Sequence, residues 1–397
     1  MGLKLNTDIV IIGGGIAGLW TLNALRNRGY QAVLLENRAL GSYQSMGSQG
    51  MIHGGIKYAL GGALSGSSEA ISSMPDTWRA CLRGEGDVDL RGCRVLSEEF
   101  FLWSAASLHS RVSSFFASRM LRGRVKKMDP SRYPVPLRDP GFKGQVYQLV
   151  DLVLDMPSLI ETLANNHRDA IFSIDWSRAL LERAGDRAIL QLEDLTLEPE
   201  CLLLTAGAGN EALVQALGGK APAMQRRPLQ QVLVKHEYPE AFYGHCTGMN
   251  PSPRLTISSH RTRAGEPVWY LGGDLATENP DDTPETLISK AQRELKDLLP
   301  WVDLGQTEWR TFTLDRAEPK QSSLLRPDQA FVGPLDSVSN ALVGWPTKLT
   351  LSPNLADAVL AELKARNIQP AAPLDLAPLA GLGRPEIAPT VWDEVFA

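Results

Sequence analysis

The chain has 397 residues, of which 43% are hydrophobic and 21% charged, and this is enough apolar sequence to bury the cores of two domains. A formal net charge of -5 argues against nucleic acid as a partner, because phosphate binding requires a clustered excess of lysine and arginine. No run approaches the length of about eighteen apolar residues that a membrane-spanning helix needs, so only peripheral membrane contact stays open.

The cysteines and histidines show no metal-binding pattern. Cys81, Cys93, Cys201 and Cys246 lie far apart and form no CxxC pair, which argues against zinc-ribbon and thioredoxin-like sites. The histidines show no HxH or HxxxH spacing, so we expect no metal site. The segment before the first apolar run, Met1–Thr7, is too short for a signal peptide, which predicts a cytoplasmic location.

The first elements of the chain form a βαβ pattern. Asp8–Ile12 and Gln31–Glu36 are apolar runs typical of buried parallel strands, and an amphipathic segment that ends at Arg28 lies between them. The sequence GGGIAG at residues 13–18 connects the first strand to this helix. A GxGxxG turn in this position is the Rossmann fingerprint of a dinucleotide-binding unit.

Each fingerprint residue has a physical reason. Gly13 permits the tight turn, Gly15 lets a pyrophosphate approach the backbone, and Gly18 lets the helix pack closely on the strand. The helix N-terminus offers free N–H groups and the positive end of the helix dipole to the phosphates. Glu36, at the end of the second strand, can accept hydrogen bonds from the ribose hydroxyls and would repel the extra phosphate of NADP.

The middle of the chain is less regular. We expect helices over Glu69–Arg83, Leu96–Arg122 and Asp151–Asn166, the last with a proline in its first turn. Ala170–Trp176 and Ala188–Leu192 alternate between apolar and polar residues as strands do.

Cys201–Asn210 is another buried strand that ends in small residues, which suit either a chain passing beneath a nucleotide or a tight turn into a helix. Short strands separated by turn residues then predict an antiparallel sheet: Leu229–Lys235, Leu255–Ser259, Val268–Gly272 and Trp309–Leu314. Asn354–Arg366 is an amphipathic helix, and the proline-rich residues 367–397 are typical of a loosely ordered arm.

Four separated blocks resemble the FAD-dependent D-amino acid oxidase/glycine oxidase superfamily. They are the fingerprint unit, the stretch SMGSQGMIHGGIKY over Ser45–Tyr58, the turn TAGAGN over Thr205–Asn210, and PTKLT over Pro346–Thr350. The second and fourth blocks are similar to the branch of glycerol-3-phosphate dehydrogenases and oxidases.

The chain departs from that branch at several positions. Gly47 and Gly50 stand where Arg and Lys are usual, Lys57 replaces an Arg, and Ser352-Pro353 replaces Tyr-Arg. The branch's C-terminal helical extension is also missing, so the 2-hydroxyglutarate oxidases of the same branch resemble this chain's length better.

The resemblance implies an α/β fold in which a Rossmann-type FAD-binding domain is interleaved with an α+β substrate domain built on an antiparallel sheet. The FAD-binding domain would be discontinuous, comprising residues 1–80, 140–215 and 325–366. The substrate domain would comprise 81–139 and 216–324, followed by a C-terminal arm, 367–397.

The resemblance also implies FAD bound without a covalent bond, and the last third of the chain indeed contains no cysteine to form one. The residues that it implies for FAD binding are Gly13, Gly15, Ile16, Ala17, Gly18, Glu36, Asn37, Ser45, Ser48, Gln49, Met51, Thr205, Ala206, Gly207, Gly344, Lys348, Leu349 and Thr350.

A flavin oxidises an alcohol or amine by taking a hydride at N5 while a base takes the proton. His53 is the best candidate base, because imidazole titrates near neutral pH and the flanking glycines allow close approach; the alternative is a residue that packs on the flavin. Lys348 precedes a helix start, where it could stabilise the reduced flavin or bind an anion, or could be a solvated surface lysine.

The resemblance places Lys57, Tyr58 and Arg316 over the flavin as further anion-binding candidates. An arginine can bind a carboxylate or phosphate in a bidentate fork. Arg316 could equally form a local ion pair with Asp315 or Glu318.

The sequence therefore predicts an FAD-dependent oxidoreductase that oxidises a small anionic substrate, a 2-hydroxy acid or polyol phosphate, by hydride transfer to flavin N5. One alternative is an amine or amino-acid oxidase of the same fold, since fold does not fix chemistry. Another is a flavin-dependent tailoring or RNA-modifying enzyme. The electron acceptor, whether oxygen, a quinone or a protein, stays open.

Overall fold

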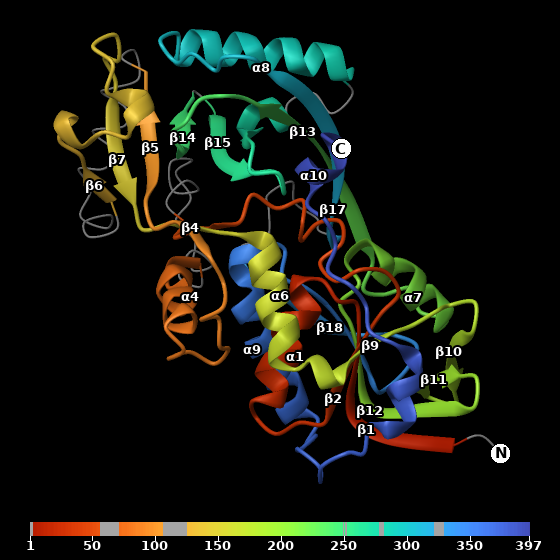
Figure 1. Ribbon diagram of the computed structural model, residues 1–397. Helices are drawn as coiled ribbons and strands as arrows, with labels where there is room; N and C mark the ends of the chain where they lie inside the picture. Colours follow the sequence, from red (N-terminus) through yellow and green to blue (C-terminus); the bar gives the residue numbers. More distant parts are fainter. Residues whose placement is uncertain are drawn as a thin grey trace.

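The computed structural model describes residues 3–55, 71–105, 125–248, 250, 252–277, 282–320 and 329–397. Its strands form one mixed sheet of eight, a second sheet of eight and a small sheet of three. Figure 1 shows the two large sheets at opposite ends of the molecule, with the N-terminus at the end formed by the first sheet. Among the described residues, no helix is long and apolar enough to cross a membrane.

The first sheet contains the predicted βαβ unit. Its order is β10-β11-β12-β1-β2-β9, with β19 beside β12 and β18 beside β19. The strands β19, β12, β1, β2 and β9 pair in parallel, which confirms the Rossmann-type arrangement. The strands are β1 (Leu3–Ile12), β2 (Ala32–Glu36), β9 (Ile171–Ser173), β10 (Ala179–Ala184), β11 (Arg187–Leu192), β12 (Leu195–Leu204), β18 (Phe331–Pro334) and β19 (Ala341–Trp345).

Helices cover the first sheet because both of its faces are apolar. On β1, Ile9 and Ile11 face a core formed with helices α1, α6 and α9, whereas Val10 and Ile12 face a core formed with β10, β11 and α7 (Figure 1). Burial on both faces explains the unbroken apolar runs in the sequence. The helices are α1 (Ile16–Arg26), α6 (Met156–Asn166), α7 (Asn210–Ala216) and α9 (Ser352–Ala365).

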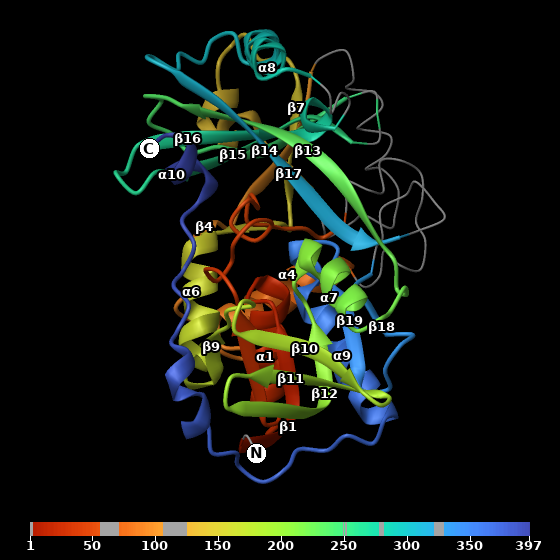
Figure 2. The ribbon, with the colours of Figure 1, turned by 90° about the vertical axis from the view of Figure 1, so that its right-hand side faces the viewer.

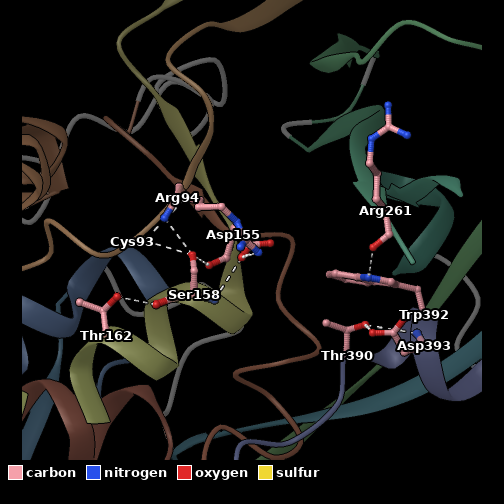
Figure 3. Close-up of polar contacts among 9 residues, drawn as sticks. All are labelled: Cys93, Arg94, Asp155, Ser158, Thr162, Arg261, Thr390, Trp392 and Asp393. Atoms are coloured by element: carbon pink, nitrogen blue, oxygen red, sulfur yellow. Dashed lines mark hydrogen bonds and ion pairs between the residues drawn. The ribbon is translucent and has the colours of Figure 1, made fainter. Parts of the chain in front are cut away.

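Helix α6 begins later than predicted because its N-cap is Asp155. The Asp155 carboxylate accepts the Ser158 N–H at 3.1 Å and a hydrogen bond from the Arg94 guanidinium at 2.7 Å (Figure 3). The Arg94 N–H in turn donates to the Ser158 hydroxyl at 2.9 Å. The preceding residues form β8 (Leu152–Leu154), which pairs with β3 (Met51–Ile52) and β4 (Val95–Ser97) in the small sheet.

The second sheet has the order β17-β13-β16-β15-β14-β5-β7-β6 and is antiparallel except between β14 and β5. This confirms the predicted antiparallel sheet. Its strands are β5 (Phe100–Ser104), β6 (Val125–Lys127), β7 (Gln145–Leu149), β13 (Met224–Lys235), β14 (Tyr243–Thr247), β15 (Pro253–Arg261), β16 (Pro267–Gly272) and β17 (Glu308–Pro319).

The two faces of the second sheet have different covers. Val232, Val234 and Trp269 pack under α8 (Pro284–Leu298), the long helix across the end of the molecule in Figure 1. Leu233 and Tyr270 point to the opposite face and pack against α10 (Val391–Val395) near the C-terminus. Successive strand residues alternate between these covers, as the pleat requires.

The structure corrects one predicted helix, confirms the described part of another and adds a helix that was not predicted. Leu96–Arg122 is not helical in its described part, because residues 95–97 and 100–104 are strands whose apolar side chains are buried by sheet pairing; residues 106–124 lie outside the described range. Helix α4 (Met74–Leu82) confirms the described part of the helix predicted over 69–83. Helix α8 was not predicted, although Thr283 caps its start.

The C-terminal arm is ordered against the rest of the molecule, and the expectation of a loose arm is wrong. It contains a 3₁₀ helix, Ala377–Leu382, and the short helix α10, and both bury a large side chain. Figure 2 shows the arm running along the molecule from the first sheet to the second. The domain boundaries stay a prediction; β7, which the sequence assigns to the FAD-binding domain, pairs within the second sheet.

Candidate functional site

The fingerprint turn has the geometry that its glycines predict. Gly13 has φ +113°, and a Cβ on it would lie 2.6 Å from the backbone of Ala206. A Cβ on Gly18 would lie 1.9 Å from the carbonyl oxygen of Gly13. Neighbouring backbone therefore lies too close for any side chain at these two positions.

The N-terminus of α1 is open to a ligand. Gly15 is the N-cap and supplies no side-chain cap, and the first turn contains no acidic residue. Of the described side chains outside this turn, the one within 4 Å of a Cβ on Gly15 would be Ser45, whose hydroxyl oxygen would lie at 3.1 Å. That hydroxyl also accepts the Ile16 N–H at 3.0 Å, which fixes Ser45 beside the turn.

Glu36 lies beside the same turn. One carboxylate oxygen accepts the Gly14 N–H at 2.6 Å, and the other accepts the Arg38 N–H at 2.8 Å. Asn37 is exposed next to it. The carboxylate is thus placed at the end of β2, where the fingerprint requires a ribose-binding group.

The small-residue turn after β12 approaches the fingerprint from the other side. The Thr205 hydroxyl donates to the carbonyl oxygen of Gly13 at 3.1 Å, and the Trp345 indole donates to that of Gly207 at 3.1 Å. Asn210 connects this turn to β19, because its side chain accepts the Ala206 N–H at 2.7 Å and donates to the Gly344 carbonyl at 3.4 Å.

The segment from Ser45 to Met51 passes from the first sheet to the second. The Tyr270 hydroxyl on β16 donates to the Gly47 carbonyl at 2.8 Å, and the Gln49 side chain donates to the Tyr270 carbonyl at 3.0 Å. The Ser48 hydroxyl accepts the Gly50 N–H at 3.2 Å. Met51 then starts β3.

His53 belongs to a buried polar pair that the sequence did not predict. Its Nδ1 lies 2.9 Å from Asp151 Oδ2, and the other carboxylate oxygen accepts the Gly54 N–H at 2.8 Å. Only 8% of His53 and 2% of Asp151 is exposed. When Nδ1 donates its proton to Asp151 in this contact, Nε2 keeps the lone pair that a base needs.

Two more residues fix the His53 ring. The ring stacks on His245 of β14, with centroids 5.7 Å apart and planes 27° from parallel. His245 is itself held by Thr256, whose hydroxyl lies 2.8 Å from its Nδ1. Phe100 of β5 contacts both histidine rings.

The PTKLT block meets His53 directly. The Thr350 hydroxyl accepts the His53 N–H at 2.9 Å. Lys348, half-buried, is the residue before a 3₁₀ turn that contains Leu349 and leads into α9. The structure therefore brings the second and fourth sequence blocks together.

Arg316 lies on β17 and is half-buried, so it belongs to a strand and not to a loop. Of its acidic neighbours, Glu318 forms an ion pair with Arg227, and Asp315 lies 4.0 Å from Arg226. The Gln44 side chain donates to the Asp315 carbonyl at 3.0 Å, which places this end of β17 beside the segment that follows residue 44.

Lys57 and Tyr58 lie outside the described residues. Asp151 and His245 were missed because neither belongs to a motif. The signal for Asp151 was a single acidic residue between two apolar runs, and a charge in that setting needs a buried partner.

Among the residues that the structure describes, none is arranged to support metal or thiol chemistry. Within the described ranges, no three His, Cys, Asp or Glu residues are grouped to hold a metal ion. All four cysteines are free and buried. Burial raises the pKa of Cys93, Cys201 and Cys246 to about 12, so these thiols stay protonated at neutral pH.

The arrangement fits an FAD. Three consecutive glycines, a helix N-terminus with no acidic residue in its first turn and a carboxylate at the end of β2 suit its adenosine diphosphate half. The glycine-rich segment from Gly47 to Gly54 leads from there to the buried His53 pair.

Comparison with known proteins identifies the family of the chain. The DAO family, described as FAD dependent oxidoreductase, matches residues 8–324. A probable FAD-dependent oxidoreductase of Pseudomonas aeruginosa is 49% identical over 398 residues and 100% of both chains. The crystal structure with that description matches with a TM-score of 0.86 and 44% identity over 100% of each chain.

More distant structures share the fold. Glycine oxidase from Geobacillus kaustophilus matches with a TM-score of 0.65 at 16% identity, over 94% of this chain and 98% of that one. L-alpha-glycerophosphate oxidase from Mycoplasma pneumoniae with FAD bound matches with a TM-score of 0.62 at 12% identity, over 96% and 99%. The predicted superfamily is confirmed: the chain belongs to the DAO family of FAD-dependent oxidoreductases, is an enzyme, and uses FAD as its cofactor.

Proposed function

We propose that this enzyme oxidises a small anionic substrate, a 2-hydroxy acid or polyol phosphate, beside His53. The observation that carries the proposal is the buried hydrogen bond between His53 and Asp151. Oxidising a hydroxyl requires a base for its proton, whereas an amine that binds neutral needs none. A histidine held by a buried carboxylate is suited to that task.

In the proposed reaction, Asp151, His53 and His245 have different roles. Asp151 holds the Nδ1 proton of His53, so Nε2 can take the proton of the substrate hydroxyl. Stacking on His245 keeps the ring in one orientation. When bound, FAD supplies the acceptor of the hydride at N5.

Cations near this pair would hold the substrate's anion. Arg316 and Leu314 are two residues apart on β17 and therefore lie on the same face of the strand. Leu314 lies close to Gly47, because a Cβ added to Gly47 would be 3.1 Å from Leu314 Cδ2. Lys348 is two residues before Thr350, which binds the His53 backbone. We assign substrate binding to Arg316 with Lys348, Lys57 and Tyr58, and FAD binding to the eighteen residues that the resemblance implies.

Anaerobic flavin bleaching tests this function. The purified holoenzyme is mixed with a panel of 2-hydroxy acids, polyol phosphates and amino acids, and the flavin absorbance is followed. We expect a hydroxy substrate to reduce the flavin. His53→Ala should slow that reduction by about 10²–10⁴-fold at unchanged FAD content.

Two further variants sharpen the result. Asp151→Asn keeps the shape of the side chain but loses its charge, so it should slow reduction in the same direction. His167→Ala is the matched control, because it removes a half-buried imidazole outside the His53 pair, whose Nε2 lies 3.0 Å from Asn27 Oδ1. Reduction by amino acids alone, at a rate that does not depend on His53, would contradict the proposal and favour an amine oxidase.

A further inference from the structure

We propose that the C-terminal arm, residues 367–397, retains FAD by fixing the positions of two segments of the cofactor site. These segments are Glu36–Gly41 and Gly47–Gln49. This inference rests on the assignment of those segments to FAD. It concerns how the cofactor is kept and not how the substrate is oxidised.

The first point of attachment is Leu40. Its N–H donates to the Glu386 carbonyl at 2.7 Å, and its carbonyl accepts the Ala388 N–H at 2.9 Å. The buried Leu40 side chain reaches within 2.5 Å of the position that a Cβ on Gly14 would take. The arm therefore holds the residue that packs against the fingerprint turn, four positions after Glu36.

The second point of attachment is Trp392, of which 2% is exposed. Its indole N–H donates to the Arg261 carbonyl at 3.0 Å, as Figure 3 shows. The ring stacks on His260 at 4.3 Å between centroids and meets Tyr270 edge-on at 6.4 Å. Tyr270 is the residue that binds both Gly47 and Gln49, so Trp392 supports that segment through one intervening side chain.

Helix α10 is anchored on several sides around Trp392. Thr390 caps it and contacts the Asp393 side chain (Figure 3). The Asp393 carboxylate also accepts the Arg263 N–H at 2.7 Å. The Val395 carbonyl accepts a hydrogen bond from Arg310 at 3.2 Å. A five-residue helix is unstable on its own, so its order here comes from docking.

The connection between the two points is short. Ala388 and Trp392 are four residues apart, which is at most about 14 Å of extended chain. Pro389 in this connection further restricts its conformations. With both points docked, the second sheet cannot move away from the fingerprint turn, and the segments around FAD stay together.

The test measures FAD release from the holoenzyme. Trp392→Ala and a chain that ends at Pro389 should both release FAD at least tenfold faster, followed by the fluorescence of free flavin. Trp392→Phe keeps most of the packing and should restore much of the retention. Trp309→Ala is the matched control, because it removes an indole that packs on the α8 side of the second sheet.

A second measurement needs no variant. By thermodynamic linkage, FAD binding stabilises the docked arm by the same free energy by which the docked arm stabilises bound FAD. Hydrogen exchange of residues 386–396 in the wild-type chain should therefore be slower with FAD than without it. Equal exchange, or FAD release unchanged in folded Trp392→Ala, overturns the proposal; a Glu36→Ala variant that keeps full FAD affinity overturns the underlying FAD assignment instead.

Discussion

The proposed binding of the FAD ribose by Glu36 depends on where its carboxylate is held. Its carboxylate is fixed by two backbone N–H groups beside the fingerprint turn. Glu36→Ala should weaken FAD binding, because it removes two charge-assisted hydrogen bonds to the ribose, each worth about 1.5–3 kcal/mol. Titration of apoprotein with FAD measures this. Glu182→Ala, which removes a half-buried carboxylate on β10 that accepts a hydrogen bond from Gln191, should leave the affinity unchanged.

Substitution of Arg316 tests whether the substrate is an anion. Arg316→Ala should raise the apparent KM strongly and change the flavin reduction rate at saturation much less, because losing a charge-paired contact from a desolvated site costs about 2–5 kcal/mol. Arg226→Ala is the control, since that residue is exposed and ion-paired with Glu211. An unchanged KM in Arg316→Ala would exclude Arg316 from substrate binding.

At the scale of single elements, helix α6 offers a clear stability test. Asp155→Ala should lower the free energy of unfolding by about 1 kcal/mol, because the Ser158 N–H loses its cap. Asp155→Asn keeps an acceptor oxygen and loses only the ion pair with Arg94, whose side chain is 71% exposed, so it should cost little. Urea denaturation of both variants separates the two contributions; equal losses would assign the effect to the ion pair.

Elements that follow local rules were predicted, and those that depend on partners were not. The β1-α1-β2 unit needs only glycine sterics and two apolar runs, and it lies where the sequence predicts. The run from Phe100 to Trp103 has the same apolar character as a buried helix, and only its pairing with β7 and β14 makes it a strand. Backbone groups of the proline-rich arm form hydrogen bonds with residues that are distant in sequence. Composition alone cannot predict such bonds.

At the scale of the whole molecule, two buried histidines should make the fold sensitive to acid. Burial, aided by the charge of Arg261, lowers the pKa of His236 to about 4, and burial lowers the pKa of His260 to about 3. An unfolded histidine titrates near about 6.5, so below that pH the unfolded state binds more protons than the folded state. Stability is therefore full above about pH 6.5 and falls as the pH decreases towards these folded values.

The expected loss is up to about 1.4 kcal/mol per pH unit for each histidine. Urea denaturation at pH 7.5, 6 and 5 measures it. His236→Gln should reduce the slope, because the Nδ1 atom that accepts the Tyr238 N–H is replaced by a group that does not titrate. A stability that does not change between pH 7.5 and 5 would contradict the assignment of these histidines as neutral in the fold.

The sequence by itself determined the dinucleotide-binding unit, the antiparallel character of the second sheet and the family, because each follows from short-range patterns of glycine, apolar residues and turns. Only the tertiary structure decided which side chains meet. Asp151 and His53 are 98 positions apart, and Leu40 and Ile387 lie at opposite ends of the chain. Such contacts depend on the path of the whole backbone, and no local periodicity encodes the distance between their atoms.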